Sequence, residues 1–375
     1  MKKILIVATN DYTSWGGSEV LWYQLARQFL QNNYDVAINI KNWQPEPFHI
    51  KELTELGAKL FLRGYLPPIG ILERVYNKIT KKRFDLARIN DVKQFNPDLI
   101  IISQGGNQDG DNWMKFCIKY SFKYVCISQA ADYASWPTGE LKQNLKEGYL
   151  KSSISYFVSK ANLELTQLQI VATIPQAKVI FNPFNVSYNS RIKYPENIDF
   201  YHLANVARHD FNAKGQDVLL EVIADEKWKS RNLKVNFYGN GQHSQTLKEL
   251  ILYFGLKNAE IKGHQETSSI WANNHALVLP SRYEGLPLAL VEAMLAGRFG
   301  IVTNVSGNAE VLVDNKNGFV AAAPKAEYLD EAMERAWNRR NEWEEIGLHA
   351  NKYIKTIVPE DPVAMLRKDI EKLCN

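Results

Sequence analysis

The chain has 375 residues and carries 45 Lys and Arg against 41 Asp and Glu, a formal net charge of +4. This length exceeds one typical hydrophobic core and predicts two domains. The hydrophobic content of 45% and charged content of 23% are ordinary for a globular protein and exclude a fibrous or disordered chain. No run reaches the roughly 18 apolar residues that a membrane-spanning helix needs. Cys117, Cys126 and Cys374 lack metal-ligand spacing and predict free thiols.

The first half of the sequence alternates short apolar runs with amphipathic segments. The opening run, residues 4–8, is too short for a signal peptide and predicts a strand. Residues 19–31 carry apolar side chains at helical spacing. Continuous apolar strands separated by helices predict a parallel sheet covered on both faces. Further strands are expected at residues 35–40, 98–103, 123–127 and 155–158.

Residues 66–88 begin with an apolar run and then gather basic side chains in a pattern typical of an amphipathic helix. Two interpretations stay open: a solvated helix face, or contact with an anionic membrane surface. No recognised nucleic-acid-binding motif accompanies the charge, so we expect no nucleic acid as a partner. The basic side chains are Arg74, Lys78, Lys81, Lys82, Arg83 and Arg88.

The alternation stops at residues 179–185, and the polar stretch of residues 187–199 is interpreted as an interdomain linker. A second alternating series follows, and residues 362–373 have the spacing of a final helix. The predicted class is α/β, with two Rossmann-like doubly wound domains that face a central cleft and bind ligands at the carboxyl ends of their strands. Strands of the second series are expected at residues 200–206, 233–238, 259–262, 276–279, 300–303 and 318–322.

The stretch of residues 281–297 places two carboxylates, Glu284 and Glu292, eight positions apart across a strand–loop–helix junction. Pro287 suits the first helical position, and Gly297 suits the C-terminal stop. The helix N-terminus offers unpaired N–H groups and a partial positive charge, which favour phosphate. Two hydroxyl-binding carboxylates beside such a helix end suit a sugar nucleotide. The alternative is an exposed helix residue and an ordinary loop carboxylate.

This string resembles the E-x7-E signature of retaining GT-B glycosyltransferases of the family-four type, the glycosyl transferases group 1. The resemblance implies that Glu284 contacts hydroxyls of the transferred sugar and that Glu292 holds the ribose hydroxyls of the nucleotide. Backbone amides near Leu288 would meet the diphosphate, with Gly285 and Leu286 also at the donor.

Arg208 and Lys214 lie in the loop after the first strand of the second series. A guanidinium and an ammonium can neutralise a departing diphosphate without a metal. Their Arg-x5-Lys-Gly string resembles the phosphate site of family-four enzymes, independently of the E-x7-E match. The alternative is a pair of surface cations before a helix. Arg208, Lys214 and Glu284 are the predicted catalytic residues.

Gly16 and Gly17 follow the first strand and precede a helix, where glycine lets a backbone approach a ligand closely. Family-four enzymes carry a similar loop near the donor phosphate and the acceptor, which implies a donor contact for Gly17 and an acceptor contact for Gly16. The alternative is a tight turn capped by Ser18. The resemblance also places Gly239 and Lys262, at the ends of their strands, around the base and ribose.

Two positions depart from the family pattern. Ser306 stands where relatives have the first glycine of a Gly-Gly-x-x-Glu segment. Many relatives carry a histidine after a strand like residues 123–127, whereas in this segment Ser128, Gln129 or Asp132 would occupy that space. We expect Gln129 and Asp132 at the acceptor. A glutamine cannot accept a proton, so a donor-phosphate oxygen acting as base would make the histidine dispensable. The alternative is that this loop only shapes the acceptor pocket.

Asp109 and Asp111 spell the D-x-D motif by which GT-A glycosyltransferases bind manganese. That motif serves a different fold, and the resemblance gives the metal's role to Arg208 and Lys214. We therefore expect no metal site and no cofactor besides the nucleotide-sugar donor.

The resemblance covers nearly the whole chain and implies a retaining, metal-independent glycosyltransferase. It would move a sugar from a nucleotide donor, a UDP-sugar in preference to a GDP-sugar, to a saccharide or lipid-linked acceptor in bacterial cell-surface polysaccharide assembly. Residues 1–186 would bind the acceptor, residues 187–355 the nucleotide sugar, and residues 356–375 would return to the first domain. The expected place is the cytoplasm, with peripheral contact to the inner face of the plasma membrane through residues 66–88.

Two other classes of function stay open. One is a different enzyme on the same fold, such as a nucleotide-sugar epimerase or a phosphorylase. The other is a non-catalytic protein that binds nucleotide sugars.

Overall fold

A computed structural model describes residues 1–12, 14–64, 89–196 and 199–374. The chain divides into two compact units, the first made of Met1–Pro183 with Asp361–Asn375 and the second of Phe184–Glu360. The sequence placed the boundaries at residues 186 and 355. The basic stretch of residues 66–88 lies outside the described residues. No helix within the described ranges combines the length and the apolar character that crossing a membrane requires.

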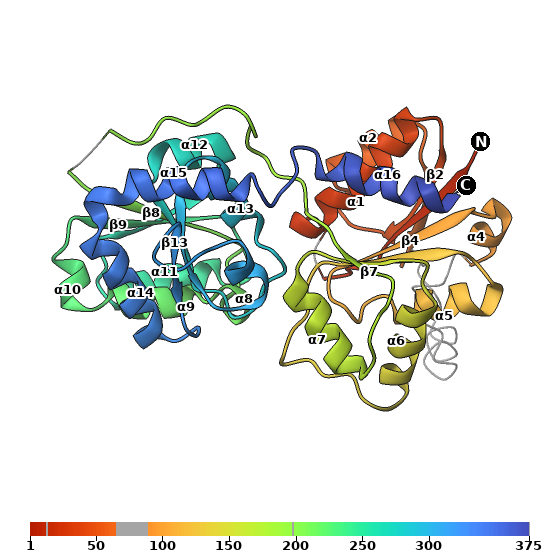
Figure 1. Cartoon of the computed structure of the whole chain (residues 1–375), viewed down its shortest axis with the longest axis horizontal. Helices are drawn as coiled ribbons and strands as arrows, with labels where there is room; N and C mark the ends of the chain where they lie inside the picture. Colours follow the sequence, from red (N-terminus) through yellow and green to blue (C-terminus); the bar gives the residue numbers. More distant parts are fainter. Residues whose placement is uncertain (13, 65–88, 197–198, 375) are drawn as a thin grey trace. The chain divides into compact units, whose positions relative to one another are not determined.

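The first unit is built on a parallel sheet in the order β3-β2-β1-β4-β5-β6-β7 (Figure 1). This order places β1 between β2 and β4, with the strand sequence reversing at that point, as in a Rossmann fold. The strands are β1 Lys3–Ala8, β2 Asp35–Lys41, β3 Lys59–Arg63, β4 Leu99–Gln104, β5 Tyr124–Ser128, β6 Ser155–Phe157 and β7 Ala177–Val179. The helices are α1 Gly17–Gln31, α2 Phe48–Glu55, α4 Ile89–Phe95, α5 Asp111–Tyr120, α6 Gly139–Lys151, α7 Lys160–Ile170 and α16 Pro362–Cys374.

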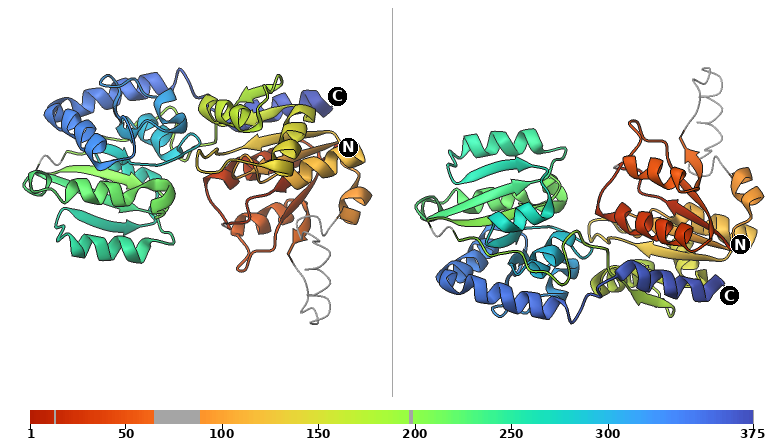
Figure 2. Two further views of the ribbon diagram at one scale, coloured as in Figure 1. Left: turned by 90° about the horizontal axis from the view of Figure 1, so that it is seen from below. Right: turned by 90° about the horizontal axis from the view of Figure 1, so that it is seen from above.

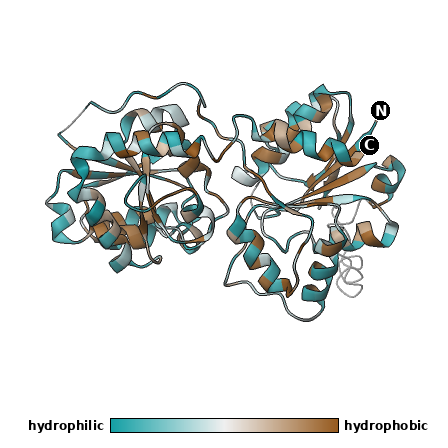
Figure 3. Cartoon of the chain, in the orientation of Figure 1, coloured by the Kyte–Doolittle hydropathy of each residue, from teal (hydrophilic) through white to brown (hydrophobic). Residues whose placement is uncertain are grey.

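Successive side chains of β1 enter two different cores, because neighbouring residues of a strand point to opposite faces of the sheet. Ile4 packs in one core with Phe29 of α1 and Ile370 of α16. Leu5 packs in the other core with Trp113 of α5. Figure 3 shows this pattern as apolar strands enclosed by helices whose outer faces are hydrophilic. A sheet that is buried on both faces explains why its strands are continuous apolar runs in the sequence.

The last helix of the chain, α16, packs against α1 and so belongs to the first unit. Arg367 Nε donates to Gln28 Oε1 of α1 at 3.2 Å. Asp369 accepts a hydrogen bond from the Tyr156 hydroxyl at 2.9 Å and forms an ion pair with Lys178 at 2.7 Å. These contacts attach the end of the chain to α1 and to strands β6 and β7.

The second unit repeats the same topology on a parallel sheet in the order β10-β9-β8-β11-β12-β13 (Figure 2). The strands are β8 Tyr201–Val206, β9 Leu233–Tyr238, β10 Ala259–Gly263, β11 Ala276–Leu279, β12 Phe299–Thr303 and β13 Gly318–Ala321. The α-helices are α8 Phe211–Lys214, α9 Gln216–Ile223, α10 Glu226–Lys229, α11 Ser244–Tyr253, α12 Thr267–Asn273, α13 Leu288–Leu295, α14 Ala326–Asn338 and α15 Trp343–Ile354, and the 3₁₀ segments are η2 Ser306–Glu310 and η3 Arg340–Glu342. The predicted α/β class with two Rossmann-like doubly wound units is confirmed.

Arg298 holds residues 192–193, near the start of the second unit, by hydrogen bonds to their backbone carbonyls. Its side chain is 1% exposed and donates its N–H groups to backbone carbonyls rather than to a carboxylate. Burial lowers the pKa of this guanidinium to about 10. The accepting carbonyls belong to Ile192 (3.2 Å), Lys193 (2.6 Å), Trp271 (2.5 Å), Asn274 (3.1 Å) and Ala296 (2.6 Å).

Several details of the predicted elements were wrong. The sequence did not predict β3 or β7, which are short and carry Lys or Arg among their residues. Lys214, expected in a loop, ends the short helix α8. Pro287 is the N-cap of α13 rather than its first helical residue, and the helix ends before Gly297, whose φ of +79° is typical of a helix stop.

Candidate donor site in the second unit

The candidate residues of the second unit gather where the strand order reverses, between β8 and β11. In an open doubly wound sheet, ligands bind outside the carboxyl ends of the strands at this point. The loop after β8 carries Arg208 and the loop after β11 carries Glu284, while Glu292 lies in α13. The topology alone therefore brings the two sequence motifs to one edge of one sheet.

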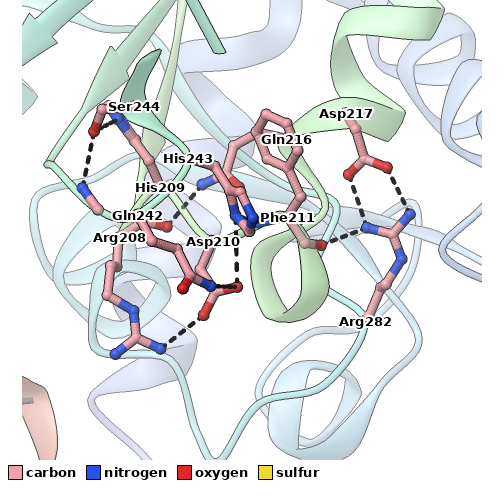
Figure 4. Close-up of polar contacts among 11 residues, drawn as sticks. Arg208, His209, Asp210, Phe211, Gln216, Asp217, Gln242, His243, Ser244 and Arg282 are labelled. Atoms are coloured by element: carbon pink, nitrogen blue, oxygen red, sulfur yellow. Dashed lines mark hydrogen bonds and ion pairs between the residues drawn. The ribbon is translucent and has the colours of Figure 1, made fainter. Parts of the chain in front are cut away.

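Arg208 is 47% exposed at its side chain and forms an ion pair with Asp210 two residues further on, with Nη2 3.0 Å from Oδ2. Figure 4 shows the pair beside Gln242 and His243, which come from the loop after β9. Gln242 Nε2 donates to the other Asp210 oxygen, Oδ1, at 3.3 Å. The guanidinium is thus held at the edge of the sheet and is partly open to solvent.

The short helix α8 brings Lys214 toward the loop after β11. Gly215 follows it with φ of +63°, and a Cβ at this glycine would lie 2.1 Å from the Pro280 carbonyl oxygen. A side chain cannot fit there, so glycine allows the two loops to meet backbone to backbone. Arg282 holds the same junction, since it donates to Phe211 O and forms a two-pronged ion pair with Asp217 at 2.8 Å (Figure 4).

Lys214 and Glu284 are direct partners. Lys214 Nζ lies 2.7 Å from both carboxylate oxygens of Glu284, which is 6% exposed. Ser281 Oγ also donates to Glu284 Oε1 at 2.7 Å. The ion pair and the hydrogen bond offset the cost of burying the carboxylate. The cation predicted for the diphosphate and the carboxylate predicted for the sugar therefore form one polar cluster.

Ser306 keeps the backbone geometry that a glycine would allow. Its φ is +46°, a left-handed conformation that few residues other than glycine adopt readily. Its hydroxyl accepts a hydrogen bond from Glu284 N at 3.1 Å, and Gly307 N donates to Gly285 O at 2.9 Å. The departure from the family pattern thus adds a contact that supports Glu284.

Glu292 is 5% exposed, which contradicts the alternative of an exposed helix residue. It lies in the second turn of α13, and its Oε1 accepts a hydrogen bond from Asn185 N at 2.9 Å. Burial raises the pKa of Glu292 to about 7. A buried carboxylate with acceptor capacity to spare suits a pair of hydroxyl donors. Leu286 is also buried, and Leu288 is the first residue of α13.

Gly239 and Gly241 lie where a side chain would collide with the backbone of the neighbouring loop. A Cβ at Gly239, where φ is +111°, would lie 2.4 Å from Ala207 O, and one at Gly241 would lie 2.4 Å from His209 O. The loops after β8 and β9 therefore touch through their backbones. Lys262 forms an ion pair with Glu260, Nζ to Oε1 at 2.6 Å, so its side chain is engaged within β10.

The family model for glycosyl transferases group 1 matches residues 189–353. This match lies within the second unit and spans most of it. An uncharacterized glycosyltransferase of Haemophilus influenzae is 26% identical to the chain over 351 residues, which span 89% of this chain and 90% of that protein.

Two solved structures align over both units of the chain. Anabaena Alr3699/HepE in complex with UDP-glucose has a TM-score of 0.76 at 15% identity and covers 99% of this chain and 100% of that chain. A mutant of S. aureus TarM, in complex with Fondaparinux, alpha-GlcNAc-glycerol and UDP, has a TM-score of 0.74 at 14% identity and covers 100% of both chains. The predicted GT-B fold is confirmed.

The first unit holds the residues predicted at the acceptor. Gly16 is the N-cap of α1 and Gly17 its first residue, so the cap is not Ser18. Gln129 exchanges hydrogen bonds with Asn182 at 3.0 and 2.6 Å. Asp132 Oδ1 accepts from Ala134 N at 2.9 Å, as in a local turn. Gln129 and Asp132 thus already hold the loop after β5 in shape.

The D-x-D aspartates lie at and before the start of α5. Asp109 Oδ2 accepts from Gly106 N at 2.6 Å, and burial raises the pKa of Asp109 to about 6. Asp111 is the first residue of α5. Over the part of the chain that the structure describes, no group of three or more His, Cys, Asp or Glu side chains could hold a metal ion.

Sequence reasoning missed the partners of the predicted site residues in the second unit. Asp210 pairs with Arg208, Ser281 donates to Glu284, and Asp217 pairs with Arg282. Asp210 lies two residues from Arg208 and Ser281 three from Glu284. This proximity was the signal available, but many neighbours in a loop do not touch.

Proposed function

We propose that the protein is a group 1 glycosyltransferase: a retaining, metal-independent enzyme of the family-four type that moves a sugar from a UDP-sugar to a saccharide or lipid-linked acceptor. The observation that carries the proposal is the cluster of Arg208, Lys214 and Glu284, with Glu292 on the adjacent helix α13. It combines two cations for a diphosphate with carboxylates for sugar and ribose hydroxyls.

The proposed roles follow from the chemistry of each side chain. Arg208 and Lys214 neutralise the negative charge that grows on the diphosphate as its bond to the sugar breaks. Glu284 accepts hydrogen bonds from the transferred sugar and orients it. Glu292 accepts hydrogen bonds from the ribose hydroxyls, and the N–H groups at the start of α13 meet the diphosphate.

Retention follows if the acceptor hydroxyl attacks on the face from which the diphosphate departs. A donor-phosphate oxygen would then take the proton of the acceptor, which is consistent with the engaged state of Gln129 and Asp132. The diphosphate cations supply the charge neutralisation that a metal supplies in other enzymes, and this is the reason for proposing metal independence.

The choice of UDP is supported by the two aligned structures, which contain UDP-glucose and UDP. A saccharide acceptor is supported by the saccharides in the TarM complex. We place the enzyme in the cytoplasm, where nucleotide sugars are made, and at the assembly of bacterial cell-surface polysaccharide. Peripheral contact with the membrane through residues 66–88 remains part of the proposal.

The experiment is a calorimetric panel of UDP, GDP and ADP, followed by transfer assays with the sugar derivatives of the nucleotide that binds. We expect UDP to bind, with binding and turnover unchanged by EDTA. Arg208→Ala should lose most of the turnover and bind UDP more weakly, with a Kd that calorimetry can still measure. The product should keep the anomeric configuration of the donor sugar, as read by NMR. Strict dependence on manganese would reject metal independence, and an inverted product would reject retention.

Two other functions predict different outcomes of the same assays. A nucleotide-sugar epimerase would change the donor without an acceptor. A protein that only binds nucleotide sugars would bind UDP but form no glycoside with any acceptor. Hydrolysis of the donor alone distinguishes neither, because it is a side reaction of many transferases.

A further inference from the structure

Asp210 contacts both of the residues assigned to the diphosphate: the guanidinium of Arg208 and the backbone N–H of Lys214. Its side-chain Oδ2 accepts from Arg208 Nη2 at 3.0 Å. Its backbone carbonyl accepts from Lys214 N at 2.6 Å and from Ala213 N at 3.1 Å, and Asp210 is the N-cap of α8. One residue therefore fixes the guanidinium directly and starts the short helix that carries the ammonium.

Asp210 is itself held in place. It is 9% exposed, and Gln242 Nε2 donates to its Oδ1 at 3.3 Å. His243 lies beside it, with Nδ1 3.9 Å from the same oxygen (Figure 4). Phe211 N donates to that Nδ1 at 3.0 Å, and the His243 and Phe211 rings stack at 4.8 Å. The loops after β8 and β9 thus enclose the carboxylate.

We propose that Asp210 is the positioning residue that holds Arg208 ready for the donor diphosphate. The inference rests on the proposed function, which gives Arg208 its phosphate. Arginine is a long side chain, and fixing it in advance removes the entropy cost of ordering it at the moment of reaction. A guanidinium has five N–H donors, and the ion pair with Asp210 engages one terminal nitrogen. The remaining donors can face a diphosphate while the carboxylate stays in contact.

Competition is the opposite possibility for the same contact. If Asp210 only blocked Arg208, the diphosphate would have to displace it, and removing its charge would tighten UDP binding and speed turnover. Positioning predicts the reverse, because a free guanidinium must be ordered during each reaction cycle.

The test is a double-mutant cycle on the full chain with Asp210→Asn and Arg208→Ala. Asparagine keeps the shape and the backbone cap of α8 while removing the charge. We expect Asp210→Asn to lower kcat about tenfold and to change the donor KM by less than about threefold, since the contact matters most when the leaving diphosphate gains charge. In the Arg208→Ala background, Asp210→Asn should cause no further loss.

The control is Asp314→Asn, which breaks the 2.8 Å ion pair with Arg335 elsewhere in the same unit and should leave kcat unchanged. If the turnover of Arg208→Ala is too slow to measure, the same cycle is carried out on the Kd for UDP. Asp210→Asn should then raise this Kd only in the chain that keeps Arg208. An equal effect of Asp210→Asn in both backgrounds, or faster turnover, would overturn the positioning role. Wild-type turnover by Arg208→Ala would reject the proposed function instead.

Discussion

The ammonium of Lys214 lies 2.7 Å from each carboxylate oxygen of Glu284, and this ion pair joins the loop after β8 to the loop after β11. A residue that the sequence assigns to the diphosphate and one that it assigns to the sugar are therefore coupled before any ligand binds. The coupling has consequences for stability as well as for activity.

Lys214→Met should destabilise the second unit more than the double variant Lys214→Met with Glu284→Gln. The single change leaves a buried carboxylate without its cation, at a cost of about 3 kcal/mol, whereas the double change removes the charge too. Urea unfolding monitored by tryptophan fluorescence measures the difference. Both variants should lack transferase activity. Equal stability of the two would mean that the pair is solvated.

Glu292→Gln should change how stability depends on pH. Because burial raises the folded-state pKa of Glu292 from 4.5 to about 7, the folded chain binds this proton more tightly than the unfolded chain. Its contribution to stability is present below pH 4.5 and is lost as the pH rises to about 7. The melting temperature of the wild type relative to Glu292→Gln should therefore fall across this window. A constant difference would place the pKa of Glu292 near its ordinary value.

Gly215→Ala should damage the junction between the loops after β8 and β11, whereas Gly255→Ala provides a matched control. Both glycines have a φ near +60°, so each substitution costs about 1 kcal/mol in backbone strain. Only the Cβ at Gly215 meets an atom within 4 Å, the Pro280 carbonyl oxygen at 2.1 Å. We expect Gly215→Ala to lose clearly more stability than Gly255→Ala and to weaken UDP binding, which calorimetry measures. Equal losses would show that the loop can move aside.

Arg298→Lys should loosen the entry of the chain into the second unit. A lysine keeps the charge, but its single ammonium cannot donate to all the carbonyls that the Arg298 guanidinium contacts. We expect the free energy of unfolding to fall by at least about 3 kcal/mol, because hydrogen bonds to a charged group are lost. Urea unfolding and limited proteolysis near Ile192 and Lys193 would detect the change. Arg335→Lys, on a partly exposed ion pair, is the control and should have little effect.

The sequence predicted the parts of the fold that depend on local pattern. The strand β11, Ala276–Leu279, was predicted with its exact bounds because a buried parallel strand is a continuous apolar run. The strands β3 and β7 were missed because they are short and their residues are mostly half-buried or exposed: the apolar run of β3 is three residues long, and β7 is a three-residue strand with a lysine at its centre. The residue types of the site were visible because Arg208, Lys214, Glu284 and Glu292 occupy recognisable strings.

The pairings within the site could not be predicted in the same way. Nothing in the spacing indicates that Glu292 meets the backbone of Asn185, 107 residues earlier. The Gln129–Asn182 pair, 53 residues apart, is equally invisible in the sequence. Such contacts follow from the sheet order, which a single sequence does not determine. These contacts determine whether a polar side chain is available to bind a ligand or is already hydrogen-bonded within the protein.

The packing of α16 on α1 has a practical consequence for anyone who exchanges parts of this protein. The second unit is an insertion into the first, since the chain leaves the first unit after Pro183 and re-enters it at Asp361. A chimera that joins this first unit to a foreign donor domain must carry two splice points rather than one. A single fusion near residue 183 would replace α16 with the last helix of the foreign protein. Gln28, Tyr156 and Lys178 would then lose their present hydrogen-bond and ion-pair partners, which are Arg367 and Asp369 of α16.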